Sequence, residues 1–247
     1  MEINLVELWA QMGLPVKGVV IVLTLQAIAS LAVAIDRVVL LARSGSRSRT
    51  LAAAAQPLID RGEYDDALLV ASKTHGSHLA TLIHLGLKTF LDRRDAGDDR
   101  ALAAERTRRA LTRRGESVST QLQQGMNVLA STGSTAPFVG LLGTVLGIIH
   151  AFQQISLTGS GGIGAIGASI GEALIVTGYG LCVAIPTVLL FNWLEKRISD
   201  YEQGLANACG DIVDRLEMDA ARSVPISSAG TIAVREPSFD MSIEAAE

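Results

Sequence analysis

A single acidic residue lies inside an apolar stretch that is long enough to cross a membrane. Glu172 is the only formal charge in residues 165–194. A carboxylate at membrane depth costs roughly 2.5–3.5 kcal/mol or more, so it persists only where it faces protein or water, or carries a proton. Ionisable groups placed in this way usually mark ion pathways. Glu172 is therefore predicted to bind and release protons. The alternative is a structural polar residue that is hydrogen-bonded between helices.

Hydroxyl side chains near this acid suit the same chemistry. Thr144 lies in the preceding apolar run, and Thr177 follows Glu172 by five residues. Five residues turn an ideal helix by about 140°, so Thr177 and Glu172 do not share one stripe. A hydroxyl both donates and accepts a hydrogen bond, as a proton-relaying lining requires. The alternative for each threonine is a bond to a carbonyl of its own helix.

The remaining polar residues predict no metal centre. His75, His78 and His84 have a loose spacing without a cysteine or acidic partner, which favours surface histidines over zinc ligands. His150, near the outer end of the second apolar run, has no role that its neighbours define. No phosphate loop, nucleophile elbow or zinc motif occurs, so neither a cofactor nor an enzymatic activity is predicted.

The composition predicts an all-α membrane protein. Apolar residues make up 49% of the 247, charged residues only 19%, and the net charge of -4 gives no indication of nucleic-acid binding. Three apolar runs are predicted to be transmembrane helices, at 16–42, 126–157 and 165–194. Lys17 and Arg37 flank the uncharged part of the first run and are expected to snorkel toward water.

The segments between these runs set the orientation. Residues 43–125 are rich in Lys and Arg, whereas residues 158–164 form a short loop without a basic residue. By the positive-inside rule, residues 1–15 and 158–164 face outward, and 43–125 face the cytoplasm as a helical region with breaks near Gly62 and Gly76. Residues 195–222 are predicted to continue the third span as a cytoplasmic helix, and 223–247 to be a disordered tail.

Small residues crowd the second and third spans at four-residue spacing, which lets helix backbones approach closely. The residues predicted to pack helices are Gly140, Gly143, Gly147, Gly167 and Gly171, and two prolines, Pro137 and Pro186, are expected to free carbonyls and kink their helices.

Two long motifs carry a family resemblance. STAPFVGLLGTVLGIIHAF (134–152) and IGEALIVTGYGLCVAIPTVLLFN (170–192) resemble the second and third membrane helices of the MotA/TolQ/ExbB proton-channel proteins. The layout of three spans is more similar to the TolQ/ExbB branch than to the flagellar one. By position, Thr144 and Thr177 match the two family threonines that line the proton path, and Glu172 matches a glutamate common in this branch. Tyr179 and His150 depart from the family pattern.

The resemblance implies partners and a mechanism. Family members form a ring, typically a homo-pentamer, around two copies of a single-pass ExbD/TolR-like membrane protein. Proton flow past an aspartate of that partner drives motion, so the proton motive force of the bacterial inner membrane does mechanical work. In such a membrane, the orientation given by the positive-inside rule places the N-terminus in the periplasm and the C-terminus in the cytoplasm. Two other functions stay open: a transporter permease subunit and a structural membrane scaffold.

Overall fold

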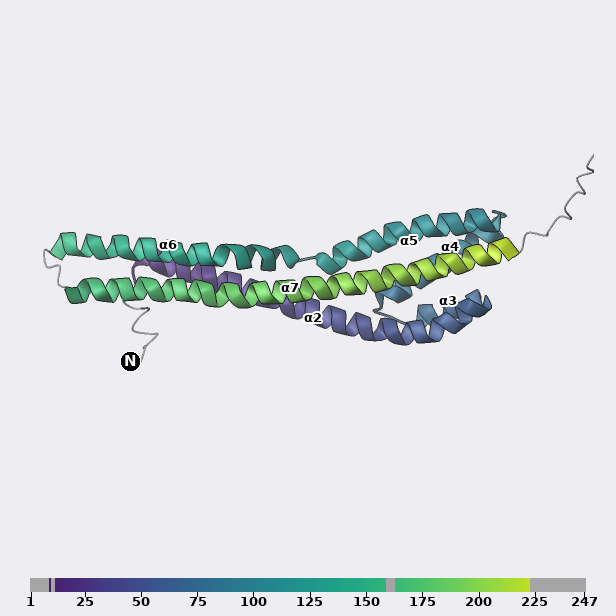
Figure 1. Ribbon diagram of the computed structural model, residues 1–247, viewed down its shortest axis with the longest axis horizontal. Coiled ribbons are helices and arrows are strands. Elements are labelled where there is room, and N and C mark those ends of the chain that lie inside the picture. The colour runs from purple at the N-terminus through teal and green to yellow at the C-terminus, as the bar shows by residue number, and fades with distance from the viewer. Residues whose placement is uncertain (1–8, 10–11, 159–162, 223–247) are drawn as a thin grey trace, which may run out of the picture.

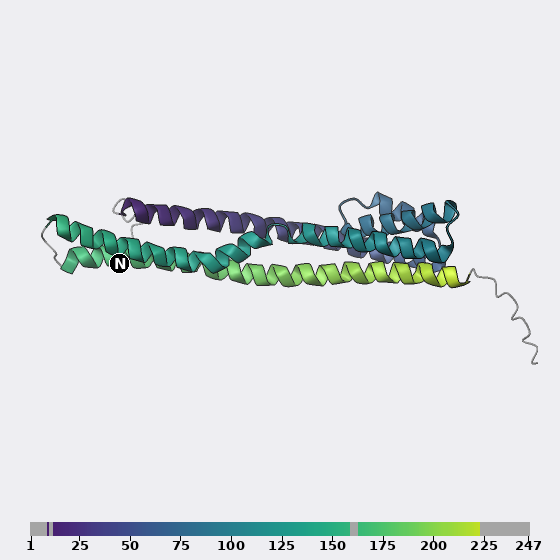
Figure 2. The same cartoon turned by 90° about the horizontal axis from the view of Figure 1, so that it is seen from above.

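The computed structural model describes residue 9 and residues 12–158 and 163–222. These residues form helices and no strand, in the order α2 (Leu14–Arg61), α3 (Tyr64–Lys73), α4 (His78–Asp95), α5 (Arg100–Gln123), α6 (Met126–Thr158) and α7 (Ile163–Arg222). Figures 1 and 2 show one elongated bundle. The first half of α2, all of α6 and the first half of α7 lie at one end, and α3, α4 and α5 lie at the other. The all-α prediction is confirmed.

Two helices run without a break through both halves of the bundle. α2 has 48 residues and α7 has 60, so at about 1.5 Å per residue they are about 72 and 90 Å long. α2 ends at Arg61, where Gly62 adopts φ 78°, and Gly76 adopts φ 75° before α4. A residue with positive φ does not continue a right-handed helix, and glycine adopts this conformation at little cost. The breaks expected near these two glycines are therefore confirmed.

Three helical stretches are long and apolar enough to cross a membrane. They are Leu14–Arg61, Arg100–Ser156 and Gly167–Asp219, and only 22–28% of the residues in their most apolar windows are buried inside the chain. Large side chains such as Leu25, Phe138 and Leu189 are more than half exposed. A soluble protein rarely leaves so much contiguous apolar surface uncovered, so lipid or further protein must cover it. The three predicted spans thus have the length and surface that a membrane requires.

The opposite half of the bundle has an ordinary hydrophobic core. α4 and α5 pack against each other and against the second half of α7. Leu82, Leu87, Leu122 and Leu216 are fully buried between them. Ser77 caps α4 by accepting a hydrogen bond from the backbone NH of Ala80 at 3.2 Å. This half therefore packs as a water-soluble helical domain.

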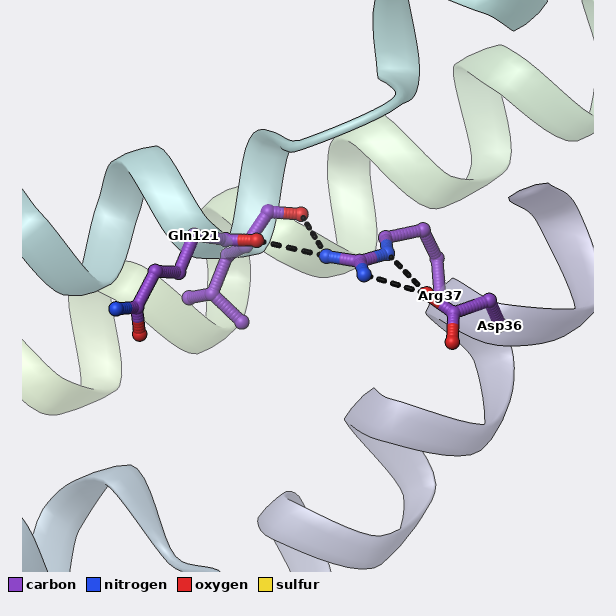
Figure 3. A network of polar contacts seen from close by, with 4 residues as sticks. Asp36, Arg37 and Gln121 are labelled. Atoms are coloured by element: carbon purple, nitrogen blue, oxygen red, sulfur yellow. Dashed lines mark hydrogen bonds and ion pairs between the residues drawn. The ribbon is translucent and has the colours of Figure 1, made fainter.

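A buried arginine joins the two halves. Arg37 of α2 donates hydrogen bonds to the carbonyl oxygens of Gln121 (2.7 Å) and Leu122 (3.4 Å) in the last turn of α5, and it pairs with Asp36 (Figure 3). Cationic side chains stabilise helix C-termini by satisfying these last carbonyls. Arg37 is only 8% exposed, so its guanidinium is held by protein. The expectation that Arg37 snorkels to water is wrong.

The turn between α5 and α6 lies against the same part of α2. Gly125 has φ 82°, and a Cβ at this position would be 3.0 Å from Cγ1 of Val33. Only glycine fits both the backbone conformation and the space. The joint formed by Val33, Arg37 and Gly125 therefore fixes where the membrane half ends and the soluble half begins.

His78 is not the surface histidine that its spacing suggested. Its Nδ1 lies 2.8 Å from Oγ of Ser44, and Oγ of Ser44 lies 2.7 Å from the hydroxyl of Tyr201, which in turn lies 2.9 Å from Oγ of Ser48. The network joins α2, α4 and α7. Burial, reinforced by the charges of Arg114 and Arg37, lowers the pKa of His78 from its ordinary value. Sequence spacing missed this network because its partners come from three distant helices.

Candidate functional site

The predicted site residues lie where α6 and α7 pack most closely. A Cβ at Gly180 would be 2.8 Å from the carbonyl oxygen of Ala136 and 3.0 Å from Cα of Gly140, and one at Gly140 would be 3.2 Å from Cα of Thr177. These distances are below ordinary van der Waals contact, so side chains larger than hydrogen do not fit at either glycine. The two backbones therefore approach as closely as small-residue motifs allow.

Thr177 uses this approach to bridge the two helices. Its Oγ1 donates a hydrogen bond of 2.7 Å to the carbonyl oxygen of Gly140. Thr187 and Thr135 instead bond within their own helices, to Val183 and Ser131. Thr177 therefore bonds to the neighbouring helix and not to a carbonyl of its own helix, and its role in a proton path stays a prediction.

Thr144 is placed differently. Its Oγ1 donates to the carbonyl oxygen of Leu141 at 2.6 Å, within its own helix. It is half-buried, next to Gly143 at the contact with α7. No hydrogen bond joins Thr144, Thr177 and Glu172 to one another among the described residues. A relay through the three residues therefore requires water, a neighbouring chain or a partner.

Glu172 lies in the first part of α7 and is half-buried. Its Oε1 is enclosed and has no hydrogen-bond partner within the described part of the chain. The titratable groups of the other two helices that act on this carboxyl are His150 of α6 and Lys17 of α2. An enclosed carboxyl oxygen without a donor is costly in a protein interior, and its retention usually indicates function. Glu172 thus keeps an open position for a proton or a hydrogen-bond donor.

The remaining small residues divide into two groups. Gly143 and Gly147 meet α7 closely, since their Cβ atoms would be 2.5 Å from Cγ1 of Val176 and 2.7 Å from Cβ of Ala173. Among the described residues, no atom lies within 4 Å of such a Cβ at Gly167 or Gly171. Their predicted role in helix packing stays a prediction.

Both prolines lie inside continuous helices. α6 runs through Pro137 and α7 runs through Pro186. A proline removes the hydrogen bond to the carbonyl four residues earlier, which leaves the carbonyls of Gly133 and Cys182 without that donor. Pro186 also lines a 230 Å³ cavity with Ser30 and Tyr179, and Oγ of Ser30 is buried there without a partner in the described chain.

Sequence reasoning missed the polar contacts that the first span makes with the other two. Thr24 of α2 lies 3.1 Å from the hydroxyl of Tyr179, and Nε2 of Gln26 donates to Oγ1 of Thr135 at 3.3 Å. Tyr179, noted as a departure from the family pattern, thus has a hydroxyl partner on α2. Polar residues at positions 24 and 26 within an otherwise apolar span were the available signal.

Comparisons with known proteins identify a family match that spans the predicted site residues. The family model of the MotA/TolQ/ExbB proton channel family matches residues 77–207, which include Thr144, Glu172 and Thr177. The chain is 54% identical over 98 residues to a "Biopolymer transport protein ExbB" of Xanthomonas campestris pv. campestris (strain B100), covering 40% of this chain and 35% of that protein.

Two further relatives extend the comparison. A protein of the same name from Neisseria gonorrhoeae is 48% identical over 92 residues, or 37% of this chain and 42% of its own length. One from Salmonella typhimurium is 29% identical over 174 residues, or 70% of each. The alignments thus span well under half of the first two relatives. Because the family model covers more than half of it, the chain belongs to the MotA/TolQ/ExbB proton channel family, in its TolQ/ExbB branch.

Proposed function

We propose that this chain is the proton-channel subunit of an inner-membrane complex that couples the proton motive force to mechanical work. The observation that carries the proposal is Glu172, whose enclosed Oε1 has no donor within the described chain although it lies in an apolar span. A carboxyl in this state can take up a proton without breaking an existing hydrogen bond. Thr177 and Thr144 supply hydroxyls nearby without adding charge.

The assembly follows from the surfaces that the single chain leaves open. Added Cβ atoms at Gly167 and Gly171 would meet no described atom within 4 Å, and many large apolar residues of all three spans are exposed. We propose a homo-pentameric ring that encloses two copies of a single-pass ExbD/TolR-like protein. Native mass spectrometry in mild detergent should show five copies of this chain, and a stable monomer would contradict the ring.

The membrane orientation belongs to the same proposal. Most of the basic residues belong to the segment 43–125, which includes α3, α4 and α5 at one end of the bundle, whereas α6 ends and α7 begins at the other end (Figure 1). By the positive-inside rule, the first end faces the cytoplasm and the N-terminus faces the periplasm. Cysteine labelling from either side of the membrane tests this orientation directly.

The test of function uses proteoliposomes that hold the chain with and without an ExbD/TolR-like partner. We expect proton flux only with the partner, and loss of flux in Glu172→Gln, which keeps the shape and hydrogen bonding of the carboxyl but carries no charge. Glu172→Ala removes both properties and serves as the packing comparison. Full flux in assembled Glu172→Gln would show that Glu172 is structural. An absence of flux in every combination would instead favour the permease or scaffold alternatives.

A further inference from the structure

His150 packs against α2 at the outer end of the membrane half. It lies in α6, half-buried, with its ring against the N-cap residue of α2: a Cβ at Gly13 would be 3.2 Å from Cδ2 and 3.3 Å from Nε2 of His150. Its Nε2 is 3.4 Å from Nε2 of Gln154, one turn further along α6. Packing against α2 therefore fixes the ring, and the glycine provides the space that it fills.

The register of α6 and α7 brings this ring level with Glu172. Gly143 meets Val176, and Gly147 meets Ala173, so the two antiparallel helices advance together along the contact. His150 is three residues beyond Gly147, and Glu172 is the residue next to Ala173. One helical turn rises about 5.4 Å, so both side chains lie within about a turn of the same contact.

The titratable groups at this end come from all three helices. α2 contributes Lys17, α6 contributes His150 and α7 contributes Glu172, and the fields of the first two act on the carboxyl of the third. The ammonium of Lys17 lies 5.8 Å from the ring centroid of Trp9, a cation–π distance. Of the three, only histidine has an ordinary pKa that puts its charge change between pH 5 and 8. Its two ring nitrogens can also accept and donate a proton in turn.

We propose that His150 is a relay residue on the outer side of the proton path, which takes up a proton from the outer water and passes it to Glu172. This inference rests on the proposed function. One ring nitrogen of the imidazolium releases its proton, the carboxylate of Glu172 binds it, and the neutral ring is then free to be protonated again. The competing role is a purely steric one, in which the ring fills the space beside Gly13.

The experiment measures proton flux through the complete complex, with its partner, in proteoliposomes between pH 5.5 and 7.5. Inside and outside pH are changed together, and a potassium diffusion potential supplies a constant driving force. The supply of protons to the ring falls as the pH rises, so wild-type flux should fall severalfold toward pH 7.5. The fall should be absent in His150→Gln, whose flux is low and flat.

Two matched variants separate the relay from charge and from packing. Lys17→Gln removes the other cation and should keep the pH dependence of the flux. Gly13→Ala disturbs the contact with the ring without removing the imidazole and should also keep this pH dependence. His150→Arg carries a fixed charge and should lack this pH dependence, which keeps the test decisive if His150→Gln assembles poorly. A wild-type pH dependence that persists in His150→Gln or His150→Arg overturns the relay, and so does its loss in Lys17→Gln. No flux in the wild type at any pH would overturn the proposed function itself.

Discussion

The hydroxyl of Thr177 donates to the carbonyl oxygen of Gly140 across the contact between α6 and α7, at 2.7 Å. The bond joins two helices at a point where Gly140 has no Cβ, and this missing atom makes room for Thr177. The residue that the family resemblance assigns to the proton path therefore also holds the two helices together. Thr177 thus has a structural role in addition to its proposed role in the proton path.

Thr177→Val should remove this bond while keeping the shape of the side chain. Hydrogen bonds between membrane helices contribute about 0.6 kcal/mol on average and up to about 1.7. We expect a loss of stability in that range, together with lower proton-coupled activity. Thermal unfolding of the purified chain in detergent measures the first effect. Thr177→Ser retains a donor and should recover most of both, and a Thr177→Val variant with wild-type stability would contradict the bridging role.

Thr144→Ala should behave differently, because the hydroxyl of Thr144 bonds within its own helix. The stability of the chain should change little, whereas the activity of the assembled complex should fall if Thr144 lines the proton path. Parallel measurements of unfolding temperature and proton flux separate the two effects. A variant that unfolds much earlier but conducts normally would reverse the assignment.

Gly180→Ala should separate α6 from α7. The new Cβ would lie 2.8 Å from the carbonyl oxygen of Ala136, which is backbone and cannot swing aside. Overpacking of this kind costs about 1–3 kcal/mol. Gly178→Ala is the matched control, since a Cβ there meets no atom of the same chain within 4 Å. Equal unfolding temperatures for the two purified variants would show that the close contact does not form.

Arg37→Gln should weaken the joint between the two halves. The carbonyl oxygens of Gln121 and Leu122 would lose their charged donor inside the protein, at a cost of about 1–3 kcal/mol. Arg43→Gln, six residues later on an exposed part of α2, should cost little. Limited proteolysis near Gly125 provides a local readout, since the turn should be cut faster in Arg37→Gln alone.

The stability of the soluble half should depend on His78. Burial and the charges of Arg114 and Arg37 hold the pKa of His78 below its ordinary value. The unfolded chain then binds a proton near pH 6.5 while the folded chain does not, so the free energy of unfolding falls as pH drops through about 6.5 and levels off below the folded pKa. His78→Gln should flatten this dependence in thermal unfolding between pH 7.5 and 5.5. His75→Gln removes an exposed imidazole nearby and is its control.

Cys209 offers a test of packing in the soluble half. Burial raises the pKa of its thiol to about 11, so the reactive thiolate is scarce at neutral pH. Alkylation of Cys209 at pH 8, measured in a Cys182→Ser variant because Cys182 is exposed, should therefore be slow compared with that of an unfolded sample. Fast alkylation of the folded chain would show that the cavity of about 790 Å³ between α5 and α7, which Cys209 lines, opens readily to solvent.

The sequence predicted the helices well because their signals are local. Three apolar runs and glycines such as Gly62 and Gly76 depend only on neighbouring residues, and the structure has helices or breaks there. Contacts between helices were less predictable. The burial of Arg37 and the network of His78 depend on how α2 lies against α5 and α7, and no spacing within one helix specifies that.

The same distinction applies to the site. Glycine spacing indicated that α6 packs closely, but it could not say that Thr177, rather than Thr144, would bridge to α7. That choice follows from the register of the two helices, which the contacts of Gly140 and Gly180 establish. The motif residues were thus identifiable from sequence, whereas their hydrogen-bond partners required coordinates.

α2 and α7 pass from the membrane half into the soluble half without interruption, whereas the chain between α5 and α6 turns at Gly125. Mechanically, α2 and α7 are two continuous helices, and the chain beside them turns at Gly125. From Glu172 to Arg222, α7 continues for fifty residues, or about 75 Å, and it runs through Pro186, where one backbone hydrogen bond is missing. A displacement at the Glu172 end would therefore reach the soluble half along one helix, and Pro186 is the point where that helix bends most easily.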